Sequence, residues 1–482
     1  MKHLLLLASL CVATMLHAQV PIIDYSFLAV PPSVLVNKVI VQPDGKILVG
    51  GGFTNYAGSG KGNLVRLNSD GTVDATFNPG GSGPDFLVQD IDLMPDGRIL
   101  IAGNFNTYNG VQNNFVARLF PDGTLDPGFH VPPNSINSAV YAVALHRKNS
   151  VLVAGDFWVC SGHSQPHITR FDSTGVVDTT FLVGAGFTST VYDLLVLPDD
   201  RILAGGTFFL YQDNPCGRIA LLAPNGLFDP SMDNDPGIHG SASSVRALAR
   251  QPDGKILVGG YFTYHNSVPR AAIARLDLSG AFDPSFTSPL YPYARVDAIA
   301  VQADGHILVG GEFIGSMYDP NVPGPSCLVR MNADGSRDDT YDLGTGLGAD
   351  PGDTYFVRSI AVQQDNKVLV GGRFTSFDTE TEYHQLIRLH ESSFAGINEG
   401  HDAPAALNAW WNSRELRVTM PDGFTSGARL NVYTSTGQLV YSQRAGAAAN
   451  STIGVKMDPG TGLLLVSLEQ GNARSTAKVM VP

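Results

Sequence analysis

The sequence predicts an all-β protein: a seven-bladed β-propeller of four-stranded blades, closed by its N-terminal strand, followed by a small C-terminal β-sandwich. Turn-forming residues are abundant, with 53 Gly and 30 Pro, whereas only 16% of the residues are charged. The stretch QPDGKILVGGGF at 42–53 returns almost unchanged as QPDGKILVGGYF at 251–262. Weaker copies follow at intervals of roughly fifty residues, which is the period of a propeller blade.

The first eighteen residues have the features of a secretory signal peptide, with Lys2 at the start, a Leu-rich core and a small residue at Ala18. We therefore expect a signal peptide at 1–18, the propeller at 19–392, a linker at 393–410 and the sandwich at 411–482. No later stretch is apolar enough to predict a transmembrane segment. The formal net charge of -13 argues against a nucleic-acid partner, because phosphates require basic residues.

Each repeat contains four short segments with the pattern of β-strands; in the first repeat they are NKVIVQ, KILVGGGF, NLVRLN and TVDATF. The first two are joined by QPDGK, in which Gly45 suits the left-handed position of a tight hairpin. Asn149 and Asn366 replace this glycine in two repeats, and Asp200 is a poorer substitute. The seven repeats align on one turn residue, namely Asp44, Asp96, Lys148, Asp199, Asp253, Asp304 and Asp365.

The third and fourth segments carry a recurring Arg and Asp that the hairpin register places opposite each other. A catalytic pair would not be expected in nearly every blade, so we interpret these residues as structural ion pairs. The pairs are Arg66/Asp74, Arg118/Asp126, Arg170/Asp178, Arg275/Asp283 and Arg330/Asp338.

The seventh repeat lacks its last segment, since the pattern ends soon after Arg388. The missing D-x-x-F motif occurs before the first repeat, at Asp24–Phe27. The N-terminal strand is therefore expected to complete the seventh blade and place Asp24 beside Arg388. Closure of this kind leaves no free sheet edge.

The stretch 245–286 resembles the delta-60 repeat, and the resemblance extends over about residues 22–392. This bacterial family is read as β-propellers of mostly unassigned function, so the resemblance implies the fold and supplies no catalytic residues.

The C-terminal stretch LNVYTSTGQLVY, at 430–441, resembles the C-terminal sorting domain of the type IX secretion system. That family implies a Bacteroidota-type outer membrane, the secretion machinery as a partner, and export to the cell surface or medium. Leu464 or a near neighbour stands where the family usually has an aromatic residue. The alternative is an accessory binding module.

Aromatic residues follow the core phenylalanine of several repeats, on the face that carries the longer loops: Tyr56, Tyr108, Trp158, Tyr211 and Phe377. Exposed aromatic rings in such a position would stack on a glycan or contact a protein. The alternative is that they pack at the junctions between blades.

Acidic residues near blades six and seven are candidates for calcium binding, although they match no defined calcium loop: Asp350, Asp353, Asp378 and Glu380. The alternative is a solvated acidic loop, and we expect no other cofactor.

His163 and His167 have a metal-like spacing without a third ligand. Whether Cys160 and Cys216 form a disulfide is left open.

These features favour a secreted or cell-surface protein that binds an extracellular glycan or protein. The alternative is a polysaccharide hydrolase or lyase that uses acidic residues of blades six and seven. No catalytic residue is assigned, and the near-uniform blades argue against an enzyme. Two carboxylates converging in a pocket at the mouth of the central channel would favour catalysis, whereas repeated apolar or glycine positions there would argue against it.

Overall fold

The computed structural model divides the chain into two compact units, residues 1–394 and 395–482. The predicted signal peptide at 1–18 lies outside the described residues. Apart from two single-turn 3₁₀ helices, η1 (Tyr56–Gly58) and η2 (Arg147–Asn149), all regular elements in the described part are strands. The structure describes residues 20–24, 26–29, 35–232, 237–239, 243–265, 268–269, 271–290, 294–313, 327–341, 343, 346–348, 354–377, 385–392, 407–412, 415–419, 428–434, 439–444, 452–456, 463–470 and 473–480.

The larger unit consists of antiparallel sheets that follow one another along the chain, and we number them 1 to 7. Within each sheet the strands are named in spatial order, beginning with the innermost. The sheets are β2 (Val36–Val41), β3 (Ile47–Gly51) and β4 (Leu64–Leu67); β5 (Val88–Leu93), β6 (Ile99–Gly103) and β9 (Val116–Leu119); β10 (Val140–His146), β11 (Ser150–Gly155) and β14 (Ile168–Phe171); β15 (Val191–Val196), β16 (Ile202–Gly206) and β19 (Ile219–Leu222); β21 (Ser244–Arg250), β22 (Ile256–Tyr261) and β25 (Ile273–Leu276); β26 (Arg295–Val301), β27 (Ile307–Glu312) and β28 (Leu328–Met331); and β30 (Phe356–Val362), β31 (Val368–Arg373), β33 (Leu386–Ser392) and β1 (Val20–Ile23).

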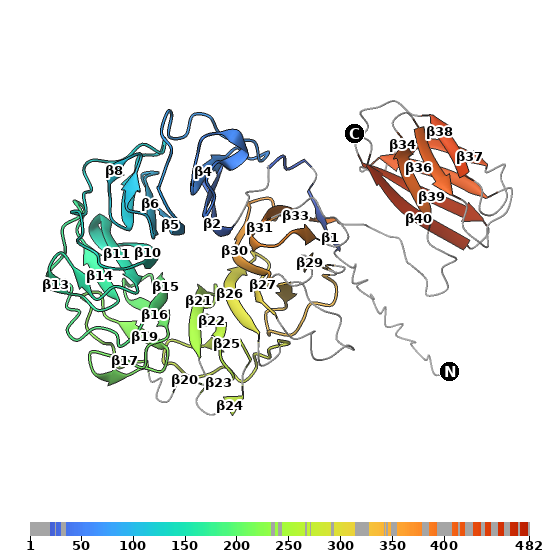
Figure 1. The fold of residues 1–482 in the computed structure, drawn as a ribbon. Coiled ribbons are helices and arrows are strands. Elements are labelled where there is room, and N and C mark those ends of the chain that lie inside the picture. The colour runs from blue at the N-terminus through green and yellow to red at the C-terminus, as the bar shows by residue number, and fades with distance from the viewer. Residues whose placement is uncertain are drawn as a thin grey trace, which may run out of the picture. The chain divides into compact units, whose positions relative to one another are not determined.

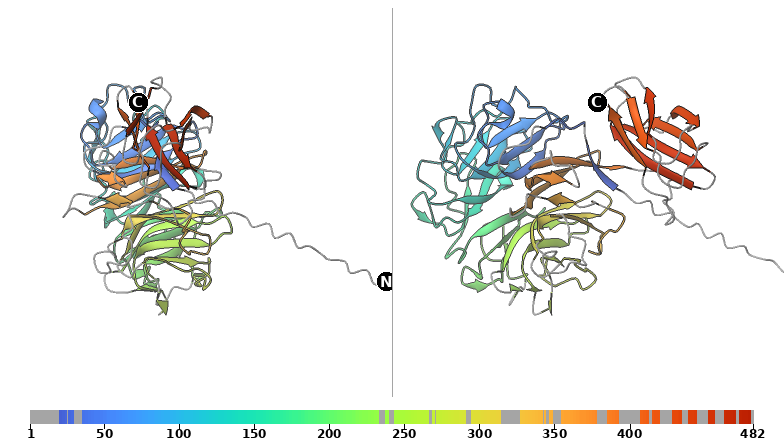
Figure 2. Two further views of the ribbon diagram at one scale, coloured as in Figure 1. Left: turned by 90° about the vertical axis from the view of Figure 1, so that its right-hand side faces the viewer. Right: turned by 45° about the vertical axis from the view of Figure 1, so that its right-hand side comes forward.

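These sheets are arranged around a common centre, with the first strand of each sheet innermost (Figure 1). Each innermost strand contacts the innermost strand of the next sheet, and β30 of sheet 7 contacts β2 of sheet 1. The hydrophobic core lies between neighbouring sheets, and one cluster joins Leu48 and Leu64 of sheet 1 to Val88 and Ile91 of sheet 2. Figure 2 shows the same sheets turned by 90° (left) and by 45° (right) about the vertical axis.

Short strands lie in the links outside the main sheets. Most form two-stranded hairpins between the second and third strands of a sheet. They are β7 (Thr107–Tyr108), β8 (Val111–Gln112), β12 (Val159–Cys160), β13 (His163–Ser164), β17 (Leu210–Tyr211), β18 (Asn214–Pro215), β20 (Ile238–His239), β23 (Tyr264–His265), β24 (Val268–Pro269), β29 (Leu347–Gly348) and β32 (Ser376–Phe377).

The tight turns adopt the conformation that the sequence predicts. Gly45 has a φ of +83°, and the three residues that replace this glycine also have positive φ values: Asn149 (58°), Asp200 (66°) and Asn366 (62°). Asp and Asn tolerate this region because their short side chains bond to the local backbone. These hairpins therefore close one end of each sheet tightly.

The fourth segment of the repeat is not a full strand in sheets 1 to 6. In sheet 1 only Val73 pairs with Leu67, through an isolated bridge. The chain leaves the sheet at Asp74, because the Asp74 carboxylate accepts hydrogen bonds from the amide and hydroxyl of Thr76 and starts a turn. The prediction of four complete strands in every blade is therefore wrong for this segment.

The recurring Arg and Asp form buried pairs that also connect neighbouring sheets. In sheet 2 the Arg118 guanidinium lies 5.0 Å from the centre of the Phe129 ring and donates a 2.7 Å hydrogen bond to the Ser173 carbonyl in sheet 3. In sheet 4 Leu221 takes the place of the arginine. The Nε–Oδ2 distances are 2.8 Å for Arg66–Asp74, 2.7 Å for Arg118–Asp126, 2.9 Å for Arg170–Asp178, 2.9 Å for Arg275–Asp283 and 2.7 Å for Arg330–Asp338.

The N-terminal segment lies in sheet 7, where β1 pairs with β33. As predicted, Asp24 lies beside Arg388, with 2.9 Å between Oδ2 and Nε. Burial opposes ionisation of Asp24, but hydrogen bonds from Ser26 and Lys367 and the charge of Arg388 lower its pKa to about 2. Arg388 also donates to the Ser69 carbonyl of sheet 1, so one side chain joins the two ends of the ring.

The smaller unit contains two antiparallel sheets, in the orders β34-β35-β38 and β37-β36-β39-β40. Residues of both sheets form one hydrophobic cluster that includes Leu416, Val455, Leu430 and Val466. No helix in the described part is long and apolar enough to cross a membrane. The strands are β34 (Asn408–Asn412), β35 (Glu415–Thr419), β36 (Arg429–Thr434), β37 (Leu439–Arg444), β38 (Thr452–Lys456), β39 (Leu463–Gln470) and β40 (Ala473–Met480).

Candidate functional site

Each innermost strand contains a β-bulge near its start. In β2, Val36 pairs with Gly51 and Lys38 pairs with Gly50, so Asn37 has no partner in the ladder. A bulge turns the side chain of the extra residue away from the regular alternation. The bulged residues of sheets 1 to 7 are, in order, Asn37, Gln89, Tyr141, Tyr192, Arg246, Asp297 and Arg358.

A pair of small residues in the second strand makes this geometry possible: its second residue is glycine in every sheet, and its first is glycine except in sheets 2 and 3, where Ala102 and Ala154 take its place. A Cβ on Gly51 would lie 2.1 Å from the Leu35 carbonyl oxygen, which the bulge turns toward it. A Cβ on Gly50 would lie 2.8 Å from Val88 of the next sheet. The sequence predicts a close approach of strands at these glycines, and the structure confirms it. The second glycine accommodates the bulge, and the first accommodates the neighbouring sheet.

All seven bulged residues line a single cavity of about 320 Å³ at the centre of the ring. Residues one and two positions further along the strands complete its wall, among them Lys38, Asp90, Asp193 and Ser359. Because the bulges lie where the innermost strands begin, the cavity is at the end that carries the links between sheets. The tight hairpins lie at the opposite end. None of the residues predicted to bind a ligand lines this cavity.

Sheets 5 to 7 contribute arginines that surround one buried carboxylate. Arg295 Nε lies 3.1 and 2.9 Å from the two carboxylate oxygens of Asp297, which is only 2% exposed. Arg246 Nη1 lies 3.7 Å and Arg358 Nη1 3.4 Å from Asp297 Oδ1. Burial and the nearby guanidinium charges of Arg295 and Arg246 lower the pKa of Arg358, although Asp297 opposes this. Three guanidinium groups thus share a single aspartate.

Sheets 1, 2 and 4 contribute a lysine and two aspartates. Lys38 Nζ lies 2.7 Å from Asp90 Oδ1, and this pair raises the lysine pKa despite burial. The second oxygen of Asp90 accepts the Val143 amide of sheet 3 at 2.9 Å. Asp193 similarly accepts the Leu248 amide of sheet 5 at 2.7 Å. These aspartates therefore face the cavity and also connect neighbouring sheets.

Two tyrosines line the cavity between these groups. The rings of Tyr141 and Tyr192 lie 5.4 Å apart, centre to centre, at an angle of 50°. The Arg246 guanidinium lies 4.3 Å from the centre of the Tyr192 ring. The wall therefore combines aromatic faces, amides and charges of both signs, a set of groups that is typical of sites for polar ligands.

We expect the Asp193→Asn variant to gain stability relative to the wild type as the pH rises from 4 to 8. Burial raises the pKa of Asp193 to about 7, Lys38 partly offsets this, and Asp90 adds to it. Ionising this carboxyl in the folded state therefore lowers the stability of the wild type. This loss is absent below the unfolded pKa, near 4, and complete above pH 7, where the folded carboxyl is ionised. The difference in unfolding free energy between variant and wild type should grow by up to about 4 kcal/mol. Urea denaturation at five pH values measures it, and a constant difference would contradict the assignment.

The predicted ring of ligand-binding aromatics is buried. Tyr56 is 1% exposed, Tyr108 and Tyr211 are 0% exposed and Phe377 is 4% exposed, so none of them can stack on an external ligand. Isolated β-bridges such as Phe187↔Tyr211 pair the outer hairpins with the links between sheets, so the hairpins pack against these links. The prediction is wrong for these four residues, and packing at the junctions between sheets is the correct interpretation.

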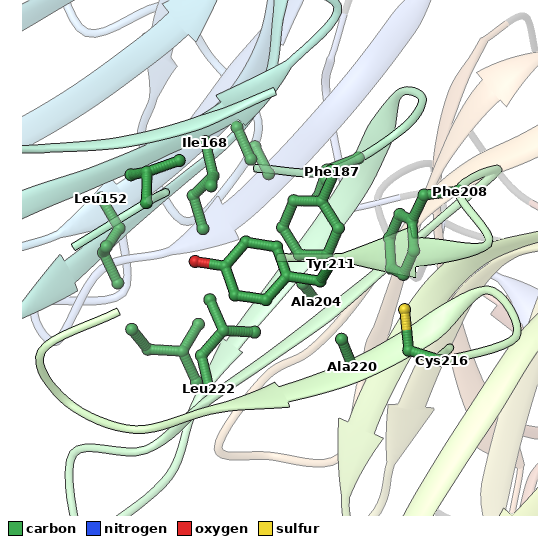
Figure 3. Packing of buried hydrophobic residues seen from close by; sticks show 14 of the residues in the cluster. Leu152, Ile168, Phe187, Ala204, Phe208, Tyr211, Cys216, Ala220 and Leu222 are labelled. Carbon is green, nitrogen blue, oxygen red and sulfur yellow. The ribbon is translucent and has the colours of Figure 1, made fainter. Parts of the chain in front are cut away.

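Tyr211 shows how such a ring is packed. Its ring lies 4.2 Å from that of Phe187, measured between centres, and among Leu152, Ile168 and Leu222 of two sheets (Figure 3). Its hydroxyl donates a 2.5 Å hydrogen bond to the Gly226 carbonyl. The residue therefore joins sheets 3 and 4 as part of the core.

Replacing these tyrosines with phenylalanine should distinguish paired from unpaired hydroxyls. Tyr108 and Tyr211 each donate to a glycine carbonyl, whereas the buried Tyr56 hydroxyl has no hydrogen-bond partner among the described residues. We expect Tyr108→Phe and Tyr211→Phe to lower the unfolding free energy by about 1 kcal/mol, and Tyr56→Phe to leave it unchanged or raise it. Chemical denaturation measures the three values, and an equal loss in all three would contradict this account.

Trp158 differs from the other predicted aromatics, because it is 53% exposed and its ring packs against His167 at 4.7 Å between centres. His167 is buried, and its Nδ1 lies 3.0 Å from the Gly155 carbonyl.

Among the described residues no three His, Cys, Asp or Glu side chains are grouped to hold a metal. The calcium candidates Asp350, Asp353, Asp378 and Glu380 lie outside the described residues.

Cys160 and Cys216 are free and buried, in two separate hydrophobic clusters. Burial raises the pKa of both thiols to about 12.

A signal for the cavity is present in the sequence. Each innermost strand has an apolar residue, then the bulged residue, and the pairs read VN, VQ, VY, VY, VR, VD and VR. The valine is present in all seven strands, whereas the next residue is an amide, a tyrosine, an arginine or an aspartate. Function was expected among repeated residues, and this position is the one that does not repeat.

Six segments of the chain match the family model described as "Domain of unknown function (DUF5122) beta-propeller": residues 42–77, 95–129, 149–181, 197–231, 251–286 and 302–341. These segments contain the second and third strands of sheets 1 to 6. The innermost strands, which carry the cavity residues, lie entirely outside the matched segments. No curated protein matches the chain.

The chain is also similar to several solved structures. One is the extracellular domain of a hybrid two-component system from B. thetaiotaomicron, at 13% identity and a TM-score of 0.41, over 92% of this chain and 51% of that one. Another is PorZ, a surface component of the type-IX secretion system of Porphyromonas gingivalis, at 11% identity and a TM-score of 0.35, over 92% and 65%. The WD40 domain of Neurospora crassa Pan2 has 12% identity and a TM-score of 0.41, over 79% and 97%.

The chain thus spans about half the length of the first of these structures and 65% of the second. The repeated part of the chain matches a β-propeller family whose function is unknown, and the larger unit is a β-propeller domain.

Proposed function

We propose that this protein is an exported binding protein whose ligand enters the central cavity of a seven-bladed propeller, with sheets 1 to 7 as its blades. One observation carries the proposal: the seven bulged residues that face the cavity belong to four chemical types, whereas positions that serve the blade are repeated. Seven blades share the same structural requirements. These requirements therefore do not explain two amides, two tyrosines, two arginines and an aspartate at one position.

The comparison with the family model supports this reading. The matched segments contain the glycine pairs and the Arg–Asp pairs, which hold the blades together. The bulged residues fall outside the matched segments, so the pattern that defines the family does not include them. Loops and variable positions on a rigid scaffold are where binding sites usually occur.

The ligand is a small polar group of the size of a sugar unit. A cavity of about 320 Å³ lies at the lower end of the range for ligand pockets. Side-chain amides and charged groups satisfy hydroxyls, and tyrosine faces pack against the apolar face of a sugar ring. An extracellular glycan that presents one residue to the cavity fits this wall better than a flat protein surface does.

Export is part of the same proposal. The signal peptide predicted at 1–18 and the resemblance of 430–441 to a type IX sorting domain support delivery to the cell surface or medium. The two sheets of the smaller unit share one core, as a small β-sandwich requires. The secretion machinery would then be a partner of that unit, and the propeller would be its cargo.

A hydrolase or lyase is the second candidate, and one observation favours it. Asp90 and Asp193 share the cavity, and the raised pKa of Asp193, about 7, lies in the range of a general acid. Asp297, the carboxylate that sheet 6 contributes to the cavity, was not among the acidic candidates predicted from the sequence; three arginines hold it, so it is poorly suited to accept a proton.

A glycan array probed with the full chain tests the proposed function. Ala298 lies where the cavity wall meets the core between sheets 6 and 7, so we expect the larger side chain of Ala298→Trp to narrow the cavity and abolish binding, with thermal unfolding to establish that the variant is folded. Trp158→Ala removes the exposed aromatic on the outside and should leave binding intact. Loss of binding in Trp158→Ala with retention in Ala298→Trp would move the site to the outer loops. Shortened glycans in the supernatant would favour the enzyme.

A further inference from the structure

We propose that Arg246 and Arg358 form a subsite for the carboxylate group of an acidic sugar at the wall of the central cavity. This inference rests on the proposed binding function and names the chemical class of its ligand. Both arginines are bulged residues, contributed by sheets 5 and 7, and both line the cavity. They stand on either side of Asp297, the bulged residue of sheet 6.

The protein does not use the donors of these two arginines. Each contacts Asp297 only at long range, 3.7 Å for Arg246 and 3.4 Å for Arg358. In the described part of the chain neither guanidinium donates a hydrogen bond, and the buried Nε of each has no partner. By contrast, Arg295 is 2.9 Å from Asp297 and also forms a 2.6 Å pair with Glu312. Arg295 is therefore satisfied by the protein, and the other two are available to a ligand.

Unsatisfied guanidinium donors are costly when they are withdrawn from water. Side-chain exposure is only 23% for Arg246 and 31% for Arg358, so both are partly removed from solvent. The planar fork of an arginine matches a carboxylate, which accepts two parallel hydrogen bonds. Two forks at one side of a cavity therefore specify an anion rather than a neutral group.

The charge balance selects a single negative charge. On the side of the cavity formed by sheets 5 to 7, the guanidinium groups of Arg246, Arg295 and Arg358 face two carboxylates, Asp297 and Glu312, which leaves one positive charge uncompensated on that side. Across the cavity Lys38 pairs with Asp90, and Asp193 adds one further carboxyl group. A carboxylate carries one negative charge at neutral pH. A phosphate monoester carries closer to two negative charges, so part of its charge would stay uncompensated at this site. The site therefore fits a carboxylate better.

The rest of the wall specifies what carries that carboxylate. The guanidinium of Arg246 lies on the Tyr192 ring, and Tyr141 stands 5.4 Å away, ring centre to ring centre. These faces adjoin the arginine and accommodate a sugar ring. Gln89 and Asn37 also line the cavity; their amide nitrogens donate to Asn104 and to the Val88 carbonyl, so their side-chain oxygens are the groups that would accept from sugar hydroxyls. The volume suits one sugar unit. A uronic acid unit meets all three requirements.

The test is calorimetric titration of the full chain, at low salt, with sodium D-glucuronate and with methyl D-glucoside as the uncharged counterpart. We expect glucuronate to bind at least tenfold more tightly. Arg246→Gln and Arg358→Gln should each weaken glucuronate binding tenfold or more and leave methyl glucoside unchanged. Arg246→Lys keeps the charge without the fork and should give an intermediate loss. Thermal unfolding confirms that each variant is folded, and Trp158→Ala is the matched control outside the cavity.

The outcomes separate this inference from the proposed function. Equal binding of both sugars, unaffected by either Arg→Gln change but abolished by Ala298→Trp, would overturn the carboxylate subsite and retain the binding function. Tighter binding of glucose 1-phosphate than of glucuronate would overturn the choice of carboxylate. Absence of binding by every sugar, together with an array response that Ala298→Trp leaves unchanged, would overturn both.

Discussion

Replacing Arg388 with alanine should lower the free energy of unfolding of the larger unit by about 3 kcal/mol, because it removes the buried partner of Asp24 and leaves that carboxylate only Ser26 and the partly exposed Lys367, 3.0 Å away. Asp24 is 8% exposed at its side chain and Arg388 only 5%. The same guanidinium lies 4.5 Å from the Phe27 ring centre and bonds to the Ser69 carbonyl of sheet 1. One substitution thus removes an ion pair, a ring contact and a hydrogen bond at the junction between the last sheet and the first, while the contact between β30 and β2 remains.

Thermal and urea unfolding measure this loss, and Arg337→Ala is its control. Arg337 pairs with Asp339 at 3.6 Å, but the two side chains are 48% and 90% exposed. A solvated pair of this kind contributes between about 0 and 1 kcal/mol. A similar loss in both variants would contradict the special role of Arg388.

Removal of residues 20–29 should have a larger effect, since it exposes the edge of β33 as well. Ile23 and Phe27 would also leave the core, where they are 4% and 9% exposed. A free edge pairs with other chains, so we expect dimers or aggregates in size-exclusion chromatography. A peptide of residues 20–29 added in trans should restore the monomer and raise the melting temperature. A truncated chain that stays monomeric and equally stable would disprove closure by this strand.

The second large effect is expected for Gly311→Ala in sheet 6. A Cβ there would lie 1.9 Å from the Arg295 carbonyl oxygen, and that atom belongs to the backbone of the bulge. Because a backbone carbonyl cannot turn aside as a side chain does, the bulge must rearrange, at a cost of about 3 kcal/mol or more. Asp297, the bulged residue, would be displaced together with the arginines around it.

Gly110→Ala is the matched control, because a Cβ at Gly110 meets nothing within 4 Å although its φ is +77°. Its expected cost of about 1–2 kcal/mol reflects the left-handed backbone alone. Differential scanning calorimetry compares the two variants. If Gly311→Ala is no more destabilised than Gly110→Ala, the glycine is not required for the bulge.

The repeated features of the fold were predictable because they depend on local chemistry. Gly45 and its replacements Asn149 and Asn366 mark hairpins through their backbone preference alone. The pairing of Arg66 with Asp74 follows from the register of one hairpin. Closure by Asp24 was predictable as well, since a motif missing at one end of the chain was present at the other.

The site was not predictable in the same way. Tyr108 and Tyr211 recur on the expected face, but their exposure depends on how the outer hairpin folds against the link before it. Likewise, nothing within one repeat indicates whether Asn37 or Lys38 faces the centre, because a bulge shifts the alternation by one residue.

The sequence by itself thus determined the strands, the turns, the repeated ion pairs and the order of the sheets, since each depends on residues near one another in the chain or on a simple repeat. Only the tertiary structure decided which residues meet at the centre. Asn37, Arg246 and Arg358 are far apart in the sequence, and each lies in a different sheet. They share one cavity because the ring brings seven strand beginnings together, and that convergence is a property of the whole ring rather than of any repeat.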